Sequence, residues 1–189
     1  MDARAVAGTT TSLAVDASFV HVAYQYAVVG GSPSLGYARR ALAGSSWALE
    51  TGYSALFNNG IGASIALGPD GRVHVTHSVG SPYFDQLYST RSPAGTWSTF
   101  PIDTAAAGGG SIALDSSGGL HVAYGSGASS RYAYLAAGSS SWVARSTPEP
   151  LLGSATRPVS LVADPFQRIH LAYVLGSSPY TLRYTLYCR

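Results

Sequence analysis

Four histidines recur at matching places in the chain, and they are the first residues whose type and spacing could do chemistry. They lie about 50 residues apart, each after an apolar residue in a short strand-like segment: His21, His74, His121 and His170. A ring of imidazoles could bind a transition metal. A histidine that bonds a turn or a backbone carbonyl and packs between strands gives the same pattern. We expect the second role, and we predict no metal and no other cofactor.

Carboxylates precede these histidines at turn positions. Asp16, Asp115 and Asp164 end the segments before the turns, and Asp70 is displaced within its own turn. A calcium site would need several oxygens at one loop, and a glycosidase needs two close carboxylates. The other acidic residues mark no such pair: Asp2, Glu50, Asp85, Asp103 and Glu149. No G-x-S-x-G, H-E-x-x-H or P-loop motif is present. We therefore predict that the chain is not an enzyme, with glycoside hydrolase as the only enzyme class considered.

The histidines belong to a repeat that organises the whole chain. Each unit has a first strand, a turn and a histidine strand, as in Ser111–Asp115 followed by Leu120–Tyr124. A third strand recurs around Tyr37, Tyr88, Tyr134 and Tyr184, and a fourth around Trp47, Trp97 and Trp142. Four short strands at a period of about 50 residues are typical of propeller blades. We predict one all-β domain over 1–189, a β-propeller of four-stranded antiparallel blades, with repeats at 12–58, 63–107, 110–152 and 159–189 plus 1–10. The recurring tryptophans are expected to pack between blades.

The ends of the chain suggest how the propeller closes. The fourth unit has no tryptophan strand, and the segment 1–10 precedes the first strand of the first unit. We expect this N-terminal segment to supply the fourth strand of the last blade, which would leave no exposed sheet edge. Closure within one chain gives a four-bladed monomer, and closure between two chains gives an eight-bladed homodimer. The sequence leaves both open.

The motif S-[IL]-A-[LV]-D-x-x-G-x-x-H-V-A-Y, followed by a tyrosine strand and G-x-x-W, resembles the BNR-like repeats of the sialidase-like superfamily. These repeats occur in large bacterial exported proteins, so the resemblance implies a propeller and an extracellular or cell-surface location. No signal peptide is visible in 1–11. The D-x-x-G turn lies here between the first and second strands, whereas the sialidase Asp-box lies between the third and fourth. Sialidase chemistry is therefore not carried over.

Composition excludes several other classes. The net charge is +2 without a basic patch, which argues against a nucleic-acid partner. No apolar run approaches the roughly 20 residues of a membrane-spanning helix. Cys188 is the only cysteine, so no intramolecular disulfide can form.

The loops after the histidine strands differ between units, and strand order places them on one face with the connections into each first strand. Variable loops on a rigid scaffold commonly carry function, and aromatic rings beside amide and charged groups suit sugars or peptides. We predict a non-catalytic module that binds a glycan or a protein at this variable-loop face. The alternatives are an assembly segment of a larger or dimeric propeller and a sialidase-like glycoside hydrolase. The candidate binding residues are Tyr53, Asn58, Asn59, Tyr83, Asp85, Arg131 and Tyr180.

Overall fold

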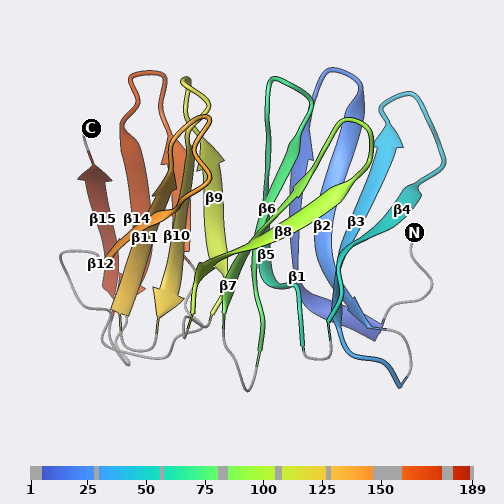
Figure 1. Ribbon diagram of the computed structural model, residues 1–189, viewed down its shortest axis with the longest axis horizontal. Helices are drawn as coiled ribbons and strands as arrows, with labels where there is room; N and C mark the ends of the chain where they lie inside the picture. Colours follow the sequence, from blue (N-terminus) through green and yellow to red (C-terminus); the bar gives the residue numbers. More distant parts are fainter. Residues whose placement is uncertain are drawn as a thin grey trace.

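The chain folds into four antiparallel sheets that stand side by side, with no helix in the described residues (Figure 1). We call the sheets blades and number them in chain order. The all-β propeller prediction is confirmed: three blades have four strands, and the last has three in the described part of the chain. The computed structural model describes residues 6–27, 30–55, 58–80, 85–104, 108–126, 129–146, 159–175 and 181–187.

Each blade is a meander whose strands pair in chain order: β1-β2-β3-β4, β5-β6-β7-β8, β9-β10-β11-β12 and β13-β14-β15. The strands, in chain order, are β1 Val6–Val15, β2 Phe19–Ala27, β3 Ser34–Ala41, β4 Ala48–Tyr53, β5 Ile61–Leu67, β6 Val73–Ser78, β7 Gln86–Arg91, β8 Trp97–Asp103, β9 Gly110–Leu114, β10 Leu120–Ser126, β11 Ser129–Leu135, β12 Val143–Ser146, β13 Val159–Ala163, β14 Ile169–Leu175 and β15 Thr181–Tyr187.

The histidine strand shows why the sequence favours blades. Along β10, Leu120 and Val122 point to one face of the sheet while His121 and Ala123 point to the other, since side chains alternate in a strand. All four are buried. A strand buried on both faces is what a blade between two neighbouring blades requires.

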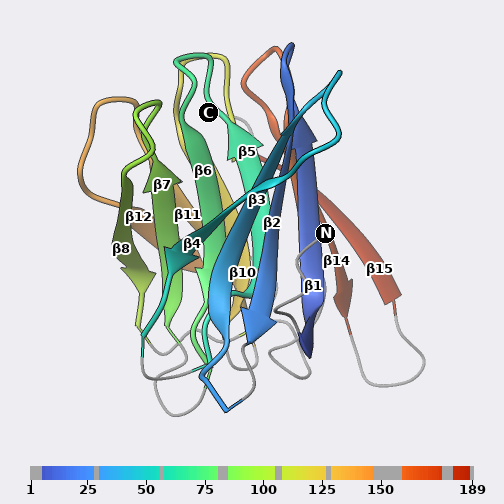
Figure 2. The ribbon, with the colours of Figure 1, turned by 90° about the vertical axis from the view of Figure 1, so that its right-hand side faces the viewer.

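The turns between the first and second strands lie at one end of the molecule, together with the turns between the third and fourth strands. We call this the turn end; it is the upper end in Figures 1 and 2. At the opposite end of the molecule, the strands connect to the predicted variable loops. We call this the loop end. In the turn after β9, Gly118 has a φ of 83° and its N–H donates to the Asp115 carbonyl at 3.0 Å. Glycine adopts this left-handed conformation without a Cβ clash.

Hydrogen bonds between first strands join successive blades in the same way each time. The backbone N–H of Ile65 in β5 donates to Ser12 Oγ in β1 at 3.2 Å. Serine thus provides a recurring side-chain bridge across the centre of the propeller. The same bond joins the second blade to the third and the third to the fourth, through Ile112 N to Ser64 Oγ at 3.2 Å and Leu161 N to Ser111 Oγ at 3.0 Å.

Aromatic pairs join the blades farther out. The ring centroids of Tyr37 and Trp97 lie 5.4 Å apart across the first junction, and those of Tyr88 and Trp142 lie 5.4 Å apart across the second. The expected packing of these two tryptophans between blades is confirmed. Three apolar cores lie between successive blades, one at each junction.

Two sequence predictions need correction. Tyr132, not Tyr134, takes the place of Tyr37 and Tyr88 in the third blade, because it lies opposite Ala123 as Tyr37 lies opposite Ala23.

The prediction that the N-terminal segment completes the last blade is wrong for the described part of that segment. Val6 and Ala7 pair with Ala27 and Tyr26, so they extend β1 in the first blade instead of adding a strand to the last. Residues 1–5 lie outside the described residues. The first and last blades lie at opposite ends of the molecule's longest axis (Figure 1).

Candidate functional site

The repeated histidines take part in a side-chain set that the third blade shows best. His121 lies on β10, and its Nε2 lies 2.9 Å from Asp115 Oδ2 in the preceding turn; its Nδ1 bonds the hydroxyl of Tyr132. Asp115 also accepts from the hydroxyl of Ser117 at 2.6 Å and the backbone N–H of Gly119 at 2.8 Å. The same Asp–His–Tyr set recurs in the first and fourth blades, as Asp16–His21–Tyr37 and Asp164–His170–Tyr184.

The Asp–His–Tyr set fixes which ring nitrogen of the neutral histidine carries the proton. An ionised carboxylate only accepts hydrogen bonds, so the neutral imidazole carries its proton on Nε2 and accepts from the tyrosine hydroxyl at Nδ1. These contacts give the histidines the structural role that the sequence predicts, bonded to a turn.

The second blade breaks the set at one position. Gly68 stands where the other blades have aspartate, although its turn has the same backbone bond: Gly68 N donates to Arg72 O at 2.8 Å, as Asp115 N donates to Gly119 O at 2.9 Å. His74 Nδ1 still bonds the Tyr88 hydroxyl at 2.7 Å. No hydrogen bond among the described residues reaches its Nε2. A Cβ at position 68 would lie 2.9 Å from that Nε2, so the imidazole lies close against the backbone of Gly68, with no side chain between them.

Asp70 does not replace the missing carboxylate. Its Oδ1 accepts the backbone N–H of Arg72 at 3.1 Å, and its Oδ2 lies 3.1 Å from Arg72 Nε. Both side chains are exposed. Asp70 is therefore a turn residue, as the sequence predicts, and it serves the arginine rather than the histidine.

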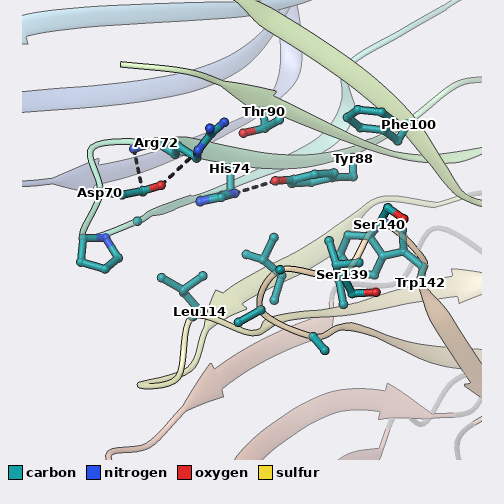
Figure 3. A pocket seen from close by; sticks show the side chains of 18 residues that line it. Asp70, Arg72, His74, Tyr88, Thr90, Phe100, Leu114, Ser139, Ser140 and Trp142 are labelled. Atoms are coloured by element: carbon teal, nitrogen blue, oxygen red, sulfur yellow. Dashed lines mark hydrogen bonds and ion pairs between the residues drawn. The ribbon is translucent and has the colours of Figure 1, made fainter. Parts of the chain in front are cut away.

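A pocket of about 610 Å³ opens beside His74, between the second and third blades at the turn end (Figure 3). We call it the interblade pocket. Its volume is within the range of small-molecule sites. The second blade contributes the rings of Tyr88 and Phe100, and the third contributes Trp142. The Phe100 ring is stacked against Tyr88 at 6.3 Å, and Trp142 meets Tyr88 edge-on. Leucines complete the walls, and polar residues line the rim: Leu114, Leu120 and Leu135, then Asp70, Arg72, Ser139 and Ser140.

The imidazole of His74 is one of the buried polar groups that line this pocket, together with the hydroxyl of Thr90. His74 is only 7% exposed. Burial lowers its pKa to about 4, so the ring is neutral at pH 7. With the tautomer of the other blades, Nε2–H is a donor on the Gly68 side of the imidazole, and Nδ1 on the other side is held by Tyr88 of the aromatic wall. The arrangement can hold a small molecule that has one apolar face and directional polar groups.

The equivalent place at the first junction is filled. Glu50 of the first blade accepts two hydrogen bonds from Arg91 of the second, from Nε and Nη2, at 2.7 Å each. Its Oε2 also accepts from Trp97 Nε1 at 2.9 Å. Glu50 corresponds to Phe100, because each pairs opposite a repeated tyrosine. Arg91 corresponds to Leu135, because each pairs opposite the first residue of a histidine strand.

The predicted site residues that the structure describes lie at the loop end, away from the interblade pocket. Tyr53 is half-buried, with its ring 5.6 Å from that of His77. Asn58 is exposed and its Oδ1 accepts from Gln25 Nε2 at 2.8 Å. Asn59 is fully buried and donates to the Pro33 and Ala55 carbonyls at 3.3 Å each. These contacts brace the loops of the first two blades.

The remaining predicted residues lie farther along the chain. Arg131 forms an ion pair with Asp103, which also accepts from the Tyr124 hydroxyl at 2.9 Å. Asp85 is half-buried, and its carbonyl accepts from Val79 N. Tyr83 and Tyr180 lie outside the described residues. Ligand binding at the loop end stays a prediction.

Sequence reasoning missed the residues of the interblade pocket. One signal was available: Gly68 stands alone where three units carry aspartate. The described residues contain no group of three or more His, Cys, Asp or Glu side chains that could hold a metal ion. They also include no helix with the length and apolar character to cross a bilayer.

Comparison with known proteins supports the architecture. No family model and no curated protein matches the sequence. A mutant Aleuria aurantia lectin in complex with Fucα1-6GlcNAc is similar over 96% of this chain and 60% of its own, with TM-score 0.66 and 14% identity. A leech intramolecular trans-sialidase is similar over 89% of this chain and 29% of its own, with TM-score 0.65 and 15% identity. A Clostridium thermocellum α-L-arabinofuranosidase is similar over 95% of this chain and 68% of its own, with TM-score 0.61 and 12% identity.

These similarities show the propeller fold that the sequence predicts. The chain spans less than two thirds of the lectin and of the trans-sialidase. At such identities the fold is shared while function is not thereby assigned.

Proposed function

We propose that the chain is a non-catalytic carbohydrate-binding module that holds a sugar in the interblade pocket. The observation that supports it is the pocket itself, which is lined by aromatic rings of two blades and by the buried imidazole of His74. A sugar ring has an apolar face that packs on aromatic rings and hydroxyls that need directional partners. The lectin of similar fold adds support, because its structure holds a fucose-containing disaccharide. Binding of a glycan or protein at the loop end remains a separate prediction.

A glycan array followed by calorimetry tests this proposal. Phe100→Ala should weaken binding of any captured glycan by 10-fold or more, because Phe100 forms an exposed wall of the pocket. Phe166→Ala is the matched control, since Phe166 is an exposed phenylalanine in the turn of the fourth blade. A blank array, or equal affinity in wild type and Phe100→Ala, would contradict the proposal.

A glycoside hydrolase remains the enzymatic alternative, because hydrolases share this fold. Glycoside hydrolysis requires two carboxyl groups flanking the bond. The residues that line the interblade pocket include one carboxylate, Asp70, and it is paired with Arg72. We therefore expect no turnover across a panel of fluorogenic glycosides that includes a sialoside. Turnover that disappears in Asp70→Asn would favour the hydrolase instead.

A second candidate function, assembly with another copy, is favoured by the two outer faces of the molecule. Leu13 on the first blade is 63% exposed, whereas its counterpart Leu161 in the fourth is 4% exposed. Tyr184 on the last blade is 62% exposed, whereas Tyr37 in the first is fully buried. The first blade thus presents one half of a blade junction, and the last blade presents the other half.

A second copy could supply both missing halves. Two copies placed head to tail would give a homodimer with eight blades, related by a two-fold axis. Light scattering should then give twice 19.5 kDa. Leu13→Arg should return the chain to a monomer, while Leu42→Arg, at an exposed turn of the same blade, should not. A wild-type mass of 19.5 kDa would count against the dimer. It would favour the alternative that further blades of a longer propeller pack against the exposed faces of the first and last blades.

A further inference from the structure

The fourth blade shows what a carboxylate does at the place that Gly68 leaves open. Asp164 Oδ2 lies 2.6 Å from Arg168 Nε and 3.2 Å from His170 Nε2. Asp164 Oδ1 accepts the backbone N–H groups of Phe166 and Arg168 at 2.8 and 2.9 Å. One carboxylate thus receives four donors from the turn and the strand that follows it.

The second blade keeps the frame of this carboxylate site. Arg72 stands at the place of Arg168, and His74 stands at the place of His170. The turn backbone is also the same, since Gly71 N donates to Gly68 O at 3.0 Å as Gln167 N donates to Asp164 O at 3.0 Å. What differs is the carboxylate: none stands at position 68, and Asp70 instead accepts from the backbone N–H and the Nε of Arg72, which leaves His74 Nε2 without a carboxylate.

His74 is the donor that the missing carboxylate leaves open. Its Nδ1 is held by the Tyr88 hydroxyl, and its Nε2 borders the interblade pocket with no partner among the described residues. A donor in a largely apolar surrounding gains most from a charged acceptor, because charge-assisted hydrogen bonds are the strong ones.

Arg72 can join in binding an anion. It is paired with Asp70, but both side chains are about half exposed, and exposed ion pairs of this kind contribute little. A Cβ at position 68 would lie 2.5 Å from Asp70 Oδ1, so the Asp70 carboxylate borders the vacant place. An incoming anion must therefore displace Asp70 from Arg72.

We propose that a carboxylate of the ligand takes the place of the missing aspartate, accepting from His74 Nε2 and Arg72 Nε, while the ligand ring lies against Phe100 and Trp142. The ligand class is an acidic sugar such as a uronic acid. This inference rests on the proposed function and names the kind of sugar that the interblade pocket selects.

Calorimetry with two matched ligands tests the inference. Methyl glucuronide and methyl glucoside differ in bearing a carboxylate or a hydroxymethyl group. The glucuronide should bind at least 10-fold more tightly to the wild-type chain. Arg72→Gln should remove most of this preference without affecting the fold, because the Arg72 side chain is exposed. Asp70→Asn should strengthen glucuronide binding several-fold, because it removes the competing carboxylate.

Gly68→Asp is the sharpest variant because it restores the repeat. The φ of Gly68 is not in the left-handed region. A Cβ there would meet Asp70 Oδ1 at 2.5 Å, at the end of an exposed side chain that can move, and His74 Nε2 at 2.9 Å, so the buried imidazole must shift as well. The new carboxylate should bond His74 and abolish glucuronide binding while the thermal midpoint stays the same or rises. Gly44→Asp, in an exposed turn of the first blade, is the matched control and should leave binding unchanged.

The outcomes separate this inference from the function it rests on. Equal binding of both glycosides, weakened alike by Phe100→Ala, would overturn the acidic-sugar inference and keep the sugar site. Binding of neither glycoside, with a neutral glycan captured on the array through Phe100, would do the same. Undiminished glucuronide binding by folded Gly68→Asp would also overturn it. Failure of every glycan to bind would remove the proposed function itself.

Discussion

The first and second junctions between blades are built from equivalent strands, yet one is filled and the other holds a pocket. At the first, the carboxylate of Glu50 lies between Arg91 and Trp97 and closes the turn end. At the second, the same places carry Phe100, Leu135 and Trp142; Trp142 meets Tyr88 across the junction, but these apolar side chains form no counterpart of the Glu50–Arg91 ion pair, and all three line the interblade pocket. The filled junction therefore differs from the one with the pocket at two positions, where an apolar residue stands in place of a charged one.

The electrostatics of the filled junction show how tightly it is held. Burial alone would raise the pKa of Glu50, but the hydrogen bonds from Arg91 and Trp97 outweigh it, and the pKa lies below its usual value. The Glu50 bond likewise raises the pKa of Arg91. Both groups stay charged at neutral pH, and a planar guanidinium that meets a carboxylate through two bonds is a well-defined contact.

The largest loss of stability is expected from a change in the Asp–His–Tyr set, which is complete in the third blade and lacks its aspartate in the second. Asp115→Ala removes a buried carboxylate from His121 and from the turn donors of Ser117 and Gly119. We expect the free energy of unfolding to fall by about 3 kcal/mol, since breaking a buried pair leaves a partner uncompensated. Urea denaturation at pH 7 measures this loss.

Asp70→Ala is the control for that experiment, because it removes an aspartate from the same turn of the second blade. Its exposed ion pair with Arg72 should contribute less than about 1 kcal/mol. Equal losses in the two variants would show that the Asp–His–Tyr set does not distinguish the third blade from the second.

A smaller loss is expected when the filled junction is broken. Glu50→Ala leaves the buried guanidinium of Arg91 and the Trp97 N–H without their acceptor. The free energy of unfolding should fall by about 2 kcal/mol, as for hydrogen bonds to charged groups. The double variant Glu50→Phe with Arg91→Leu copies the second junction into the first and should recover part of the loss. A loss in the double variant as large as in Glu50→Ala would contradict the comparison.

The converse change should close the interblade pocket. Phe100→Glu together with Leu135→Arg copies the first junction into the second. A double-mutant cycle should give a favourable coupling of about 1 kcal/mol, because the two positions are in one junction. Calorimetry should show that the double variant no longer binds any glycan that the wild type binds. Additive single effects with retained binding would show that other residues keep the pocket open.

Most of the fold could be predicted from the sequence because its signals are local. The first strand, the D-x-x-G turn and the histidine strand lie next to one another in each unit, as in 111–124. The partner predicted for the N-terminal segment was wrong because the same local preference applies to it. Val6 and Ala7 pair with the neighbouring β2, and a partner close in sequence costs less chain entropy than the distant last blade. The equivalence of Tyr132 likewise depends on strand register, which spacing alone does not fix.

The interblade pocket could be predicted only in part. Gly68 is visible as a departure from the repeat, and so is Asp70 within its turn. What the departure does depends on residues of another blade, because Leu135 and Trp142 come from the third repeat. Contacts between repeats follow from the stacking of the sheets, which strand patterns do not contain.

The last comparison concerns pH, and it distinguishes the second and third blades by the pH range in which each loses stability. Burial lowers the pKa of His74 to about 4 and that of His77 to about 3, against about 6.5 in an unfolded chain. The unfolded state therefore binds more protons between pH 6.5 and 4, so the contribution of the second blade is complete above pH 6.5 and is lost as the pH falls.

The third blade loses its contribution at lower pH. Burial would raise the pKa of Asp115, but hydrogen bonds from Ser117, His121 and the turn lower it to about 2, against 3.8 in an unfolded chain. That contribution is complete above about pH 4 and is lost toward pH 2. Urea denaturation across this range should show the free energy of unfolding falling in both steps. His74→Gln should reduce only the upper step, to which His77 also contributes, and Asp115→Asn should reduce only the lower. A single step in the wild type that neither variant changes would show that the two histidine environments do not differ in this way.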